Sequence, residues 1–125
     1  MTSPSAIQDR YPYQNEPNWS RSEKIIARKA FDAALGRELH EVMQEAKKMA
    51  SQIKKPADLG ELEYYLTERR KEIDRKFDYR YSRLTRVFGK LLYEKRLHEE
   101  DLRGLGEDKL KSIRSAAEFL AKYAA

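Results

Sequence analysis

The sequence predicts an all-α fold in which two long antiparallel stem helices carry a small C-terminal helical head, and it predicts a homodimer. Three observations support this prediction. Apolar residues recur at steps of three and four along most of the chain, which is the helical spacing. No proline interrupts residues 57–125. Hydrophobic residues make up 40% of the 125 residues, which argues against a wholly disordered chain.

The first 19 residues are predicted to form a disordered arm, because they hold three of the four prolines among polar residues without periodicity. Residues 20–125 are predicted to form one helical domain, with the stem over residues 20–80 and the head over residues 81–125. The N-terminus does not resemble a signal peptide, and no apolar run approaches the roughly 20 residues of a membrane span. We therefore expect a cytoplasmic protein that does not contact membranes.

The first stem helix is predicted to begin after Ser20. Glu23 follows at the spacing of a capping box, and Trp19 lies where a hydrophobic staple would be. The apolar positions then follow steps close to the 3.5-residue period of coiled coils. These positions are Phe31, Leu35, Leu39, Val42, Ala46, Met49 and Ile53. Pro56 is predicted to end this helix.

The second stem helix is predicted to begin at Asp58, with Glu61 at capping-box spacing, and to continue to about Arg96. Gly89 lies inside it at a cost of about 1 kcal/mol relative to Ala, which predicts close approach by another helix. A helix of this length spans about 57 Å, whereas a compact chain of this size has a diameter of about 36 Å. The long stem therefore predicts pairing with a second copy. The predicted dimer interface comprises Leu35, Leu39, Val42, Met43, Ala46, Leu62 and Leu66.

The C-terminal part is predicted to contain two shorter elements. One or two helical turns over residues 97–103 end at Gly104, and Gly106 precedes a last helix. Both are predicted to dock where the second stem helix widens its apolar face. That face consists of Leu84, Val87, Phe88, Leu91 and Leu92.

The residues needed for most enzyme and metal sites are missing from the sequence. There is no cysteine, which excludes disulfides, thiolate zinc sites and thiol nucleophiles. His40 and His98 have no partner at a metal-binding spacing, and the five glycines do not form a phosphate-binding loop. We therefore expect a protein that is not an enzyme, with no catalytic residue, no metal and no cofactor.

Positive charge is concentrated in one part of the chain, whose net charge is +5. Residues 69–96 hold eleven basic and four acidic residues, a local net charge of +7. Such a block is typical of a site for nucleic acid, an acidic membrane surface or an acidic protein partner, and equally of a solvated helix face. A nucleic-acid-binding helical dimer is the alternative function, although no helix-turn-helix spacing is present. Phe77 and Tyr81 continue the apolar spacing and are predicted to be core residues, which leaves Tyr79 free.

Arg70 is the one charged residue at an apolar position of the second stem helix. Three interpretations remain open. Its stem packs while its guanidinium reaches water, or it pairs with a carboxylate across the helices to fix their register, or it binds a carboxylate of a partner protein.

Several segments together resemble the fluorescence recovery protein family. The most specific is the run Lys76–Ser82, and the resemblance extends over residues 18–115. Further matching positions are Trp19, Ser20, Glu23, Phe31, Arg37–Leu39, Asp58, Leu59 and Arg70–Asp74. The resemblance implies an all-α homodimer without catalytic activity. It also implies binding to photoactivated orange carotenoid protein, whose return to the inactive state such proteins accelerate.

The binding surface departs from the family pattern. The family has a tryptophan, a histidine and an aspartate where this chain has Gly60, Glu63 and Tyr64, and only Arg70 is retained. A family aromatic on the head is replaced by Arg86. We therefore expect weak action on orange carotenoid protein, and a native partner that is another protein, such as a related carotenoid-binding domain. The predicted partner-binding residues are Arg70, Glu63, Tyr64, Tyr79, Arg80, Arg83 and Arg86.

Overall fold

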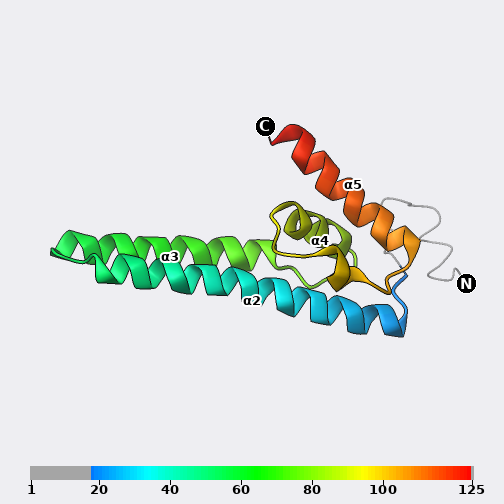
Figure 1. Cartoon of the computed structure of the whole chain (residues 1–125), viewed down its shortest axis with the longest axis horizontal. Helices are drawn as coiled ribbons and strands as arrows, with labels where there is room; N and C mark the ends of the chain where they lie inside the picture. Colours follow the sequence, from blue (N-terminus) through cyan, green and yellow to red (C-terminus); the bar gives the residue numbers. More distant parts are fainter. Residues whose placement is uncertain (1–17, 125) are drawn as a thin grey trace, which may run out of the picture.

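The computed structural model describes residues 18–124, so the predicted N-terminal arm lies outside it except for Asn18 and Trp19. Every regular element in this part is helical, which confirms the all-α prediction. The elements are α2 (Arg21–Ser51), α3 (Pro56–Lys76), α4 (Leu84–Tyr93), the 3₁₀ helix η2 (Glu99–Leu102) and α5 (Glu107–Tyr123). Helices α2 and α3 form a long hairpin, and α4, η2 and α5 gather at its open end (Figure 1).

The predicted capping box at the start of α2 is confirmed. The Ser20 hydroxyl accepts the Glu23 N–H at 3.1 Å, and the Glu23 carboxylate accepts the Ser20 N–H at 3.0 Å. The same carboxylate also accepts the Gly106 N–H at 2.9 Å and contacts Lys109 Nζ at 3.3 Å. The bonds from Ser20 and Gly106, together with Lys109, lower the pKa of Glu23 to about 2. Glu23 thus connects the first turn of α2 to the first turn of α5.

The turn of the hairpin differs from the prediction. Helix α2 ends at Ser51, before Pro56, and α3 begins at Pro56 rather than at Asp58. Proline suits the first turn of a helix because that turn has no acceptor for its N–H. Asp58 lies in this first turn, where its carboxylate accepts the N–H groups of Lys54 and Lys55 at 2.9 and 3.2 Å.

The prediction of one continuous helix from Asp58 to Arg96 is wrong, because the chain leaves the helical conformation between α3 and α4. In a helix, Phe77 and Tyr81 would share a face and Tyr79 would point away from it. Outside the helix the rings of all three residues reach an aromatic side chain at or near the first half of α2, and Tyr81 packs against Trp19. Phe77 and Tyr79 each pack edge-on against Phe31, with ring centroids 5.4 and 4.9 Å apart.

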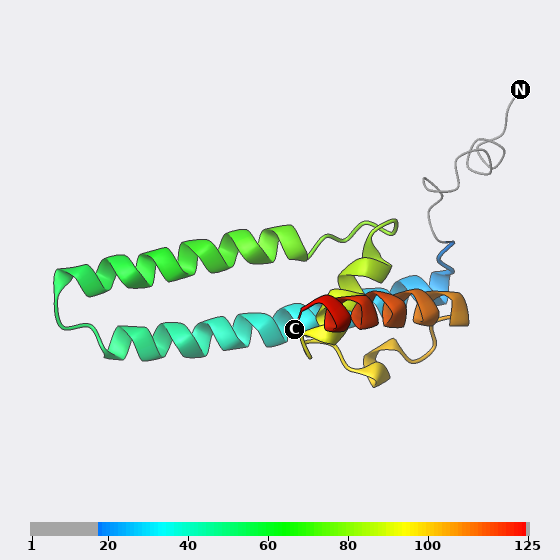
Figure 2. The ribbon, with the colours of Figure 1, turned by 90° about the horizontal axis from the view of Figure 1, so that it is seen from above.

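This break also changes the length argument for a dimer. Helix α3 has 21 residues instead of the 38 predicted, whereas α2 has 31 residues and spans about 46 Å. Helix α2 alone therefore exceeds the diameter of a compact chain of this size. Its first half contributes to the core under the head, and its second half lies along α3 (Figures 1 and 2).

The main core lies between the first half of α2 and the head. Helix α4 lies between α2 and α5 and contributes Leu84, Phe88 and Leu91, all fully buried. The prediction that the last helix docks on this face of α4 is confirmed, whereas η2, predicted to dock there too, packs against α2. The other core residues are Trp19, Ala27, Ala30, Phe31, Ala34, Leu97, Leu102, Leu105 and Ile113.

Gly89 lies where α4 and α5 approach each other, as its position in the sequence predicts. A β-carbon there would lie 2.4 Å from Ala116 Cβ and 3.0 Å from the Ile113 carbonyl oxygen. We therefore expect Gly89→Ala to lower the free energy of unfolding by about 1 kcal/mol, because overpacking costs more than the gain in helix propensity. Gly60→Ala in α3 is the control, since its β-carbon would meet nothing within 4 Å, and it should stabilise by about 0.5–1 kcal/mol. Urea unfolding followed by circular dichroism measures both, and stabilisation by Gly89→Ala would contradict the prediction.

Candidate functional site

Three predicted partner-binding residues, Glu63, Tyr64 and Arg70, lie on α3 and are exposed. Tyr64 retains 69% of its accessible surface, so its ring is open to solvent. Within residues 18–124, Arg70 makes no ion pair, whereas its neighbour Arg69 pairs with Glu38 of α2. The pairing across the helices that was one interpretation of Arg70 is therefore made by Arg69. The exposed guanidinium of Arg70 is available to water or to a partner.

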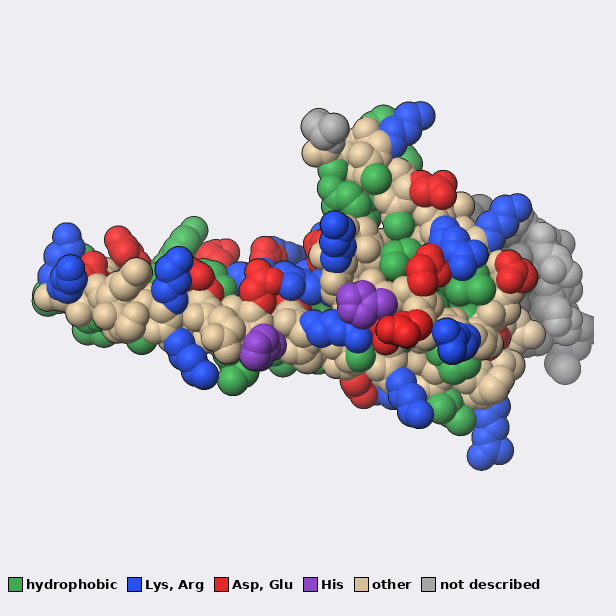
Figure 3. Space-filling view, viewed as in Figure 1, with side chains coloured by type: hydrophobic (Ala, Val, Ile, Leu, Met, Phe, Trp, Pro, Cys, Tyr) green, Lys and Arg blue, Asp and Glu red, His purple; other side chains and the backbone are tan. Residues whose placement is uncertain are grey.

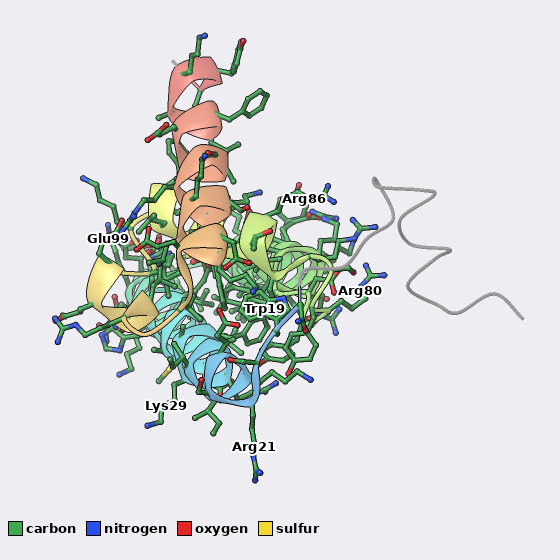
Figure 4. The ribbon with its side chains drawn as sticks, turned by 90° about the vertical axis from the view of Figure 1, so that its right-hand side faces the viewer. Trp19, Arg21, Lys29, Arg80, Arg86 and Glu99 are labelled. Atoms are coloured by element: carbon green, nitrogen blue, oxygen red, sulfur yellow. The ribbon has the colours of Figure 1, made fainter. Side chains whose placement is uncertain are left out.

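The predicted residues of the head lie on the segment after α3 and on α4. Arg80, Arg83 and Arg86 are exposed, and Figure 4 shows Arg80 and Arg86 projecting from the same side of the molecule. Arg80 donates to Asp78 through Nε at 2.8 Å. That guanidinium, with Arg83 beyond it, lowers the pKa of the Asp78 carboxyl.

The expectation that Tyr79 stays free of the core is wrong. Its ring is half-buried against Phe31, and the Arg28 guanidinium lies 4.5 Å from its centroid. Burial and the neighbouring Tyr81 raise the pKa of Tyr79 to about 12. Tyr79 therefore packs against the core, and only part of its side chain is accessible to a partner.

A buried charge cluster below the head was not predicted. Its centre is Glu38 of α2, whose side chain is only 1% exposed. The carboxylate accepts Lys76 Nζ at 2.8 Å and Arg69 Nη2 at 2.9 Å, both from α3, and Arg96 Nε lies 3.6 Å away, just beyond α4. Glu38 thus holds together α2, the end of α3 and the chain after α4.

Outer carboxylates balance the cations of this cluster. Lys76 also bonds Glu94 at 2.8 Å, Arg69 bonds Glu72, and Arg96 pairs with Glu41. Burial alone would lower the pKa of Arg69, but its bonds to Glu72 and Glu38 raise that pKa above the usual value. The Arg96 guanidinium lowers the pKa of Glu41. Arg69 and Glu41 therefore stay charged near neutral pH.

One sequence signal points to the burial of Glu38. Ala27, Ala30 and Ala34 form a stripe of small residues at helical spacing, and Glu38 is the next position of that stripe. The row of apolar positions predicted from Phe31 to Ile53 joins residues from two faces of α2, since Phe31 lies in the core whereas Leu39 is 43% exposed.

The predicted dimer-interface residues are apolar side chains of α2 and α3 that are partly or fully accessible in the single chain. Leu35, Val42, Ala46 and Leu62 are half-buried. Leu39, Met43 and Leu66 are exposed, and Figure 3 shows apolar side chains reaching the surface along the stem. Several exposed large apolar side chains on the same hairpin are typical of an interaction surface.

Within residues 18–124, no three His, Cys, Asp or Glu side chains are placed to share a metal ion. No helix of this described part is both long and apolar enough to cross a membrane.

The comparisons with known proteins agree with each other. Residues 19–117 match the family described as photoprotection regulator fluorescence recovery protein. The fluorescence recovery protein of Synechocystis sp. is 37% identical over 102 residues, which cover 82% of this chain and 94% of that protein. Its solved structure superposes with a TM-score of 0.77 at 37% identity, over 81% of this chain and 99% of that one.

The fluorescence recovery protein of Fremyella diplosiphon has a similar structure, with a TM-score of 0.76 and 39% identity, over 81% of this chain and 99% of that one. The match covers both the hairpin and the head. This chain, with its long hairpin, the interruption between α3 and α4, and α5 docked on α4, thus belongs to the photoprotection regulator fluorescence recovery protein family.

Proposed function

We propose that this chain is a non-catalytic, homodimeric regulator that binds another protein through α3 and the head. The observation that carries this proposal is the exposure of apolar and cationic side chains on α3 and on the head. Tyr64 and Arg70 on α3, with Arg83 and Arg86 on the head, are accessible. The family is described as a photoprotection regulator, which favours a regulatory role.

The proposed dimer forms through the hairpin. Leu39, Met43 and Leu66 would be removed from water when a second copy packs against the half-buried residues beside them. Each fully buried aliphatic side chain contributes about 1.5–3 kcal/mol relative to exposure, so this set favours association. Helix α2 is long enough to offer such a surface beyond the head.

The alternative of a nucleic-acid-binding dimer is not favoured. The family to which the chain belongs is described as a photoprotection regulator. Five of the eleven basic residues of the block 69–96 also pair with carboxylates of the chain itself. The engaged residues are Arg69, Lys71, Lys76, Arg80 and Arg96.

We propose that the partner is a protein related to orange carotenoid protein, and that the action on orange carotenoid protein itself is weak. Gly60 removes a large aromatic anchor, and such anchors contribute about 2 kcal/mol or more. Tyr64 removes a carboxylate, and Arg86 places a cation where the resembled family has an aromatic ring. Two such losses weaken a complex by about a hundredfold, at about 1.4 kcal/mol per tenfold.

The test is the red-to-orange decay of photoactivated orange carotenoid protein with this chain at a few-fold excess. We expect little or no acceleration. The fluorescence recovery protein of Synechocystis sp. is the positive control in the same assay. Full acceleration by this chain would show that the substitutions at the patch are tolerated and would contradict the proposed change of partner.

Arg70→Leu is expected to weaken partner binding while leaving helicity and melting temperature near the wild-type values, because Arg70 is exposed and unpaired within residues 18–124. The amount of partner recovered with the tagged chain from its host cells, identified by mass spectrometry, measures binding. Arg69→Leu is the contrast, because its loss breaks a bond to buried Glu38 and should lower stability. A stability loss above about 2 kcal/mol for Arg70→Leu would instead indicate a structural role.

A further inference from the structure

A shallow groove of about 210 Å³ lies between the end of α3 and the outer face of α4. Four of its lining residues are basic and exposed: Arg75, Arg83, Arg86 and Lys90. Half-buried Val87 lies among them and adds an apolar contact. The groove is separate from Glu63, Tyr64 and Arg70, which lie further along α3.

The charges of this groove are not balanced by the chain itself. Within residues 18–124, none of the four cations lies within 4.0 Å of a carboxylate, although the same part of the chain forms many ion pairs. The one acidic side chain of the lining, Asp78, is already bonded to Arg80. Lys76, the remaining charged residue of the lining, is bonded to Glu38 and Glu94.

The position of these cations on α4 is unfavourable in the isolated chain. Arg83 is the N-cap of α4 and Arg86 lies in its first turn, where the helix dipole is positive and acidic residues are favoured. The first turn of α4 contains no acidic residue. An anionic ligand would therefore relieve repulsion among the cations and between the cations and the helix terminus.

We propose that this groove binds an acidic polypeptide segment of the partner, which deepens the protein-binding function proposed above and rests on it. Arg83, Arg86 and Lys90 follow i, i+3, i+7 spacing on one face of α4, at a rise of about 4.5 and 6 Å between neighbours. Three carboxylates at the same spacing on a partner helix match this row. Guanidinium groups bind carboxylates with two parallel hydrogen bonds, which favours such a segment over an apolar one.

The experiment is a fluorescence anisotropy titration of the full chain with a labelled helical peptide that carries Glu at i, i+3 and i+7. An otherwise identical peptide with Gln at those positions is the ligand control. The groove variant is Arg83→Gln, Arg86→Gln and Lys90→Gln together. The protein control is Arg21→Gln, Arg103→Gln and Lys48→Gln, which removes the same number of arginines and lysines from exposed positions elsewhere.

We expect the Glu peptide to bind, the groove variant to lose at least about tenfold in affinity, and the control variant to lose less than about threefold. Binding should weaken between about 50 and about 300 mM salt, as screening increases. The melting temperature of the groove variant should stay at or above the wild-type value, because repulsion is removed.

Equal losses in the two variants, equal binding of the Gln peptide, or no saturable binding would overturn the inference. Tighter binding of a DNA duplex of equal charge, lost in the same variant, would overturn it in favour of a nucleic acid site. The titration contains no carotenoid protein and does not depend on Arg70. Its failure is therefore distinguishable from failure of the proposed function, which the Arg70→Leu comparison tests.

Discussion

Glu38→Ala is expected to lower the free energy of unfolding by about 3–5 kcal/mol, the cost of removing one partner from a buried ion pair. The side chain is 1% exposed and contacts Lys76 at 2.8 Å and Arg69 at 2.9 Å. Without this carboxylate, two cations of α3 and Arg96 face one another in a buried site where water does not fully solvate them. Because the same carboxylate joins three segments, the end of α3 and the chain after α4 should loosen together.

Urea unfolding at fixed protein concentration, followed by circular dichroism, measures this loss. Asp32→Ala is the matched control on the same helix, since it removes only the exposed pair with Arg28 and should cost about 0.5 kcal/mol. Glu38→Gln should have an intermediate effect, because it keeps hydrogen-bond acceptance and loses charge. A loss below about 1 kcal/mol for Glu38→Ala would show that water replaces the carboxylate without much cost.

Val42→Glu is expected to weaken the proposed homodimer by at least about a hundredfold, because a buried carboxylate without a partner costs several kcal/mol. Sedimentation of the wild type at micromolar concentration should give about twice 14.8 kDa, and the variant should shift toward the single-chain mass. Val42 is half-buried beside exposed Met43 and Leu39, so it lies within the apolar surface that a second copy would cover.

His40→Glu is the control for this change. It places the same carboxylate on α2, about 160° around the helix from Val42, at an exposed position. We expect its mass to remain that of the wild type. A wild type that sediments as a single chain at every concentration would contradict the dimer itself, whereas a shift in both variants would indicate a general effect of charge.

Local features of the fold could be predicted from the sequence alone. The capping box at Ser20 and the close helix approach at Gly89 depend on residues whose role is set by a single turn or a single missing side chain. Gly104, predicted to stop the short element, has a φ of 100°, which favours glycine. These predictions needed no knowledge of distant contacts.

The break between α3 and α4 could not be derived in the same way, because helical spacing of Ile73, Phe77 and Leu84 persists through it. The competing signal was the alternation of aromatic residues at 77, 79 and 81, which is the two-residue period of extended chain. Which period prevails depends on Phe31, almost 50 residues earlier in the sequence, and no local pattern contains that information.

The candidate site shows the same limit. Pairing across the helices was one interpretation of Arg70, because this residue interrupts an apolar row, yet Arg69 is the arginine that makes the contact. A difference of one residue in the rotation of α3 decides between them. The register of two helices is set by tertiary packing, so the sequence indicated the segment but not which of its two arginines is buried.

Helix α2 runs without interruption from the core under the head to the far turn of the hairpin (Figure 2). The angle between head and stem is therefore set by the stiffness of a helix and not by a flexible joint. Two copies joined along their stems would hold two heads at a constant separation. Binding through both heads at once strengthens only complexes in which the partner's own sites have the same separation. The length of α2 would therefore favour partner assemblies with matching spacing, in addition to the surface complementarity of each site.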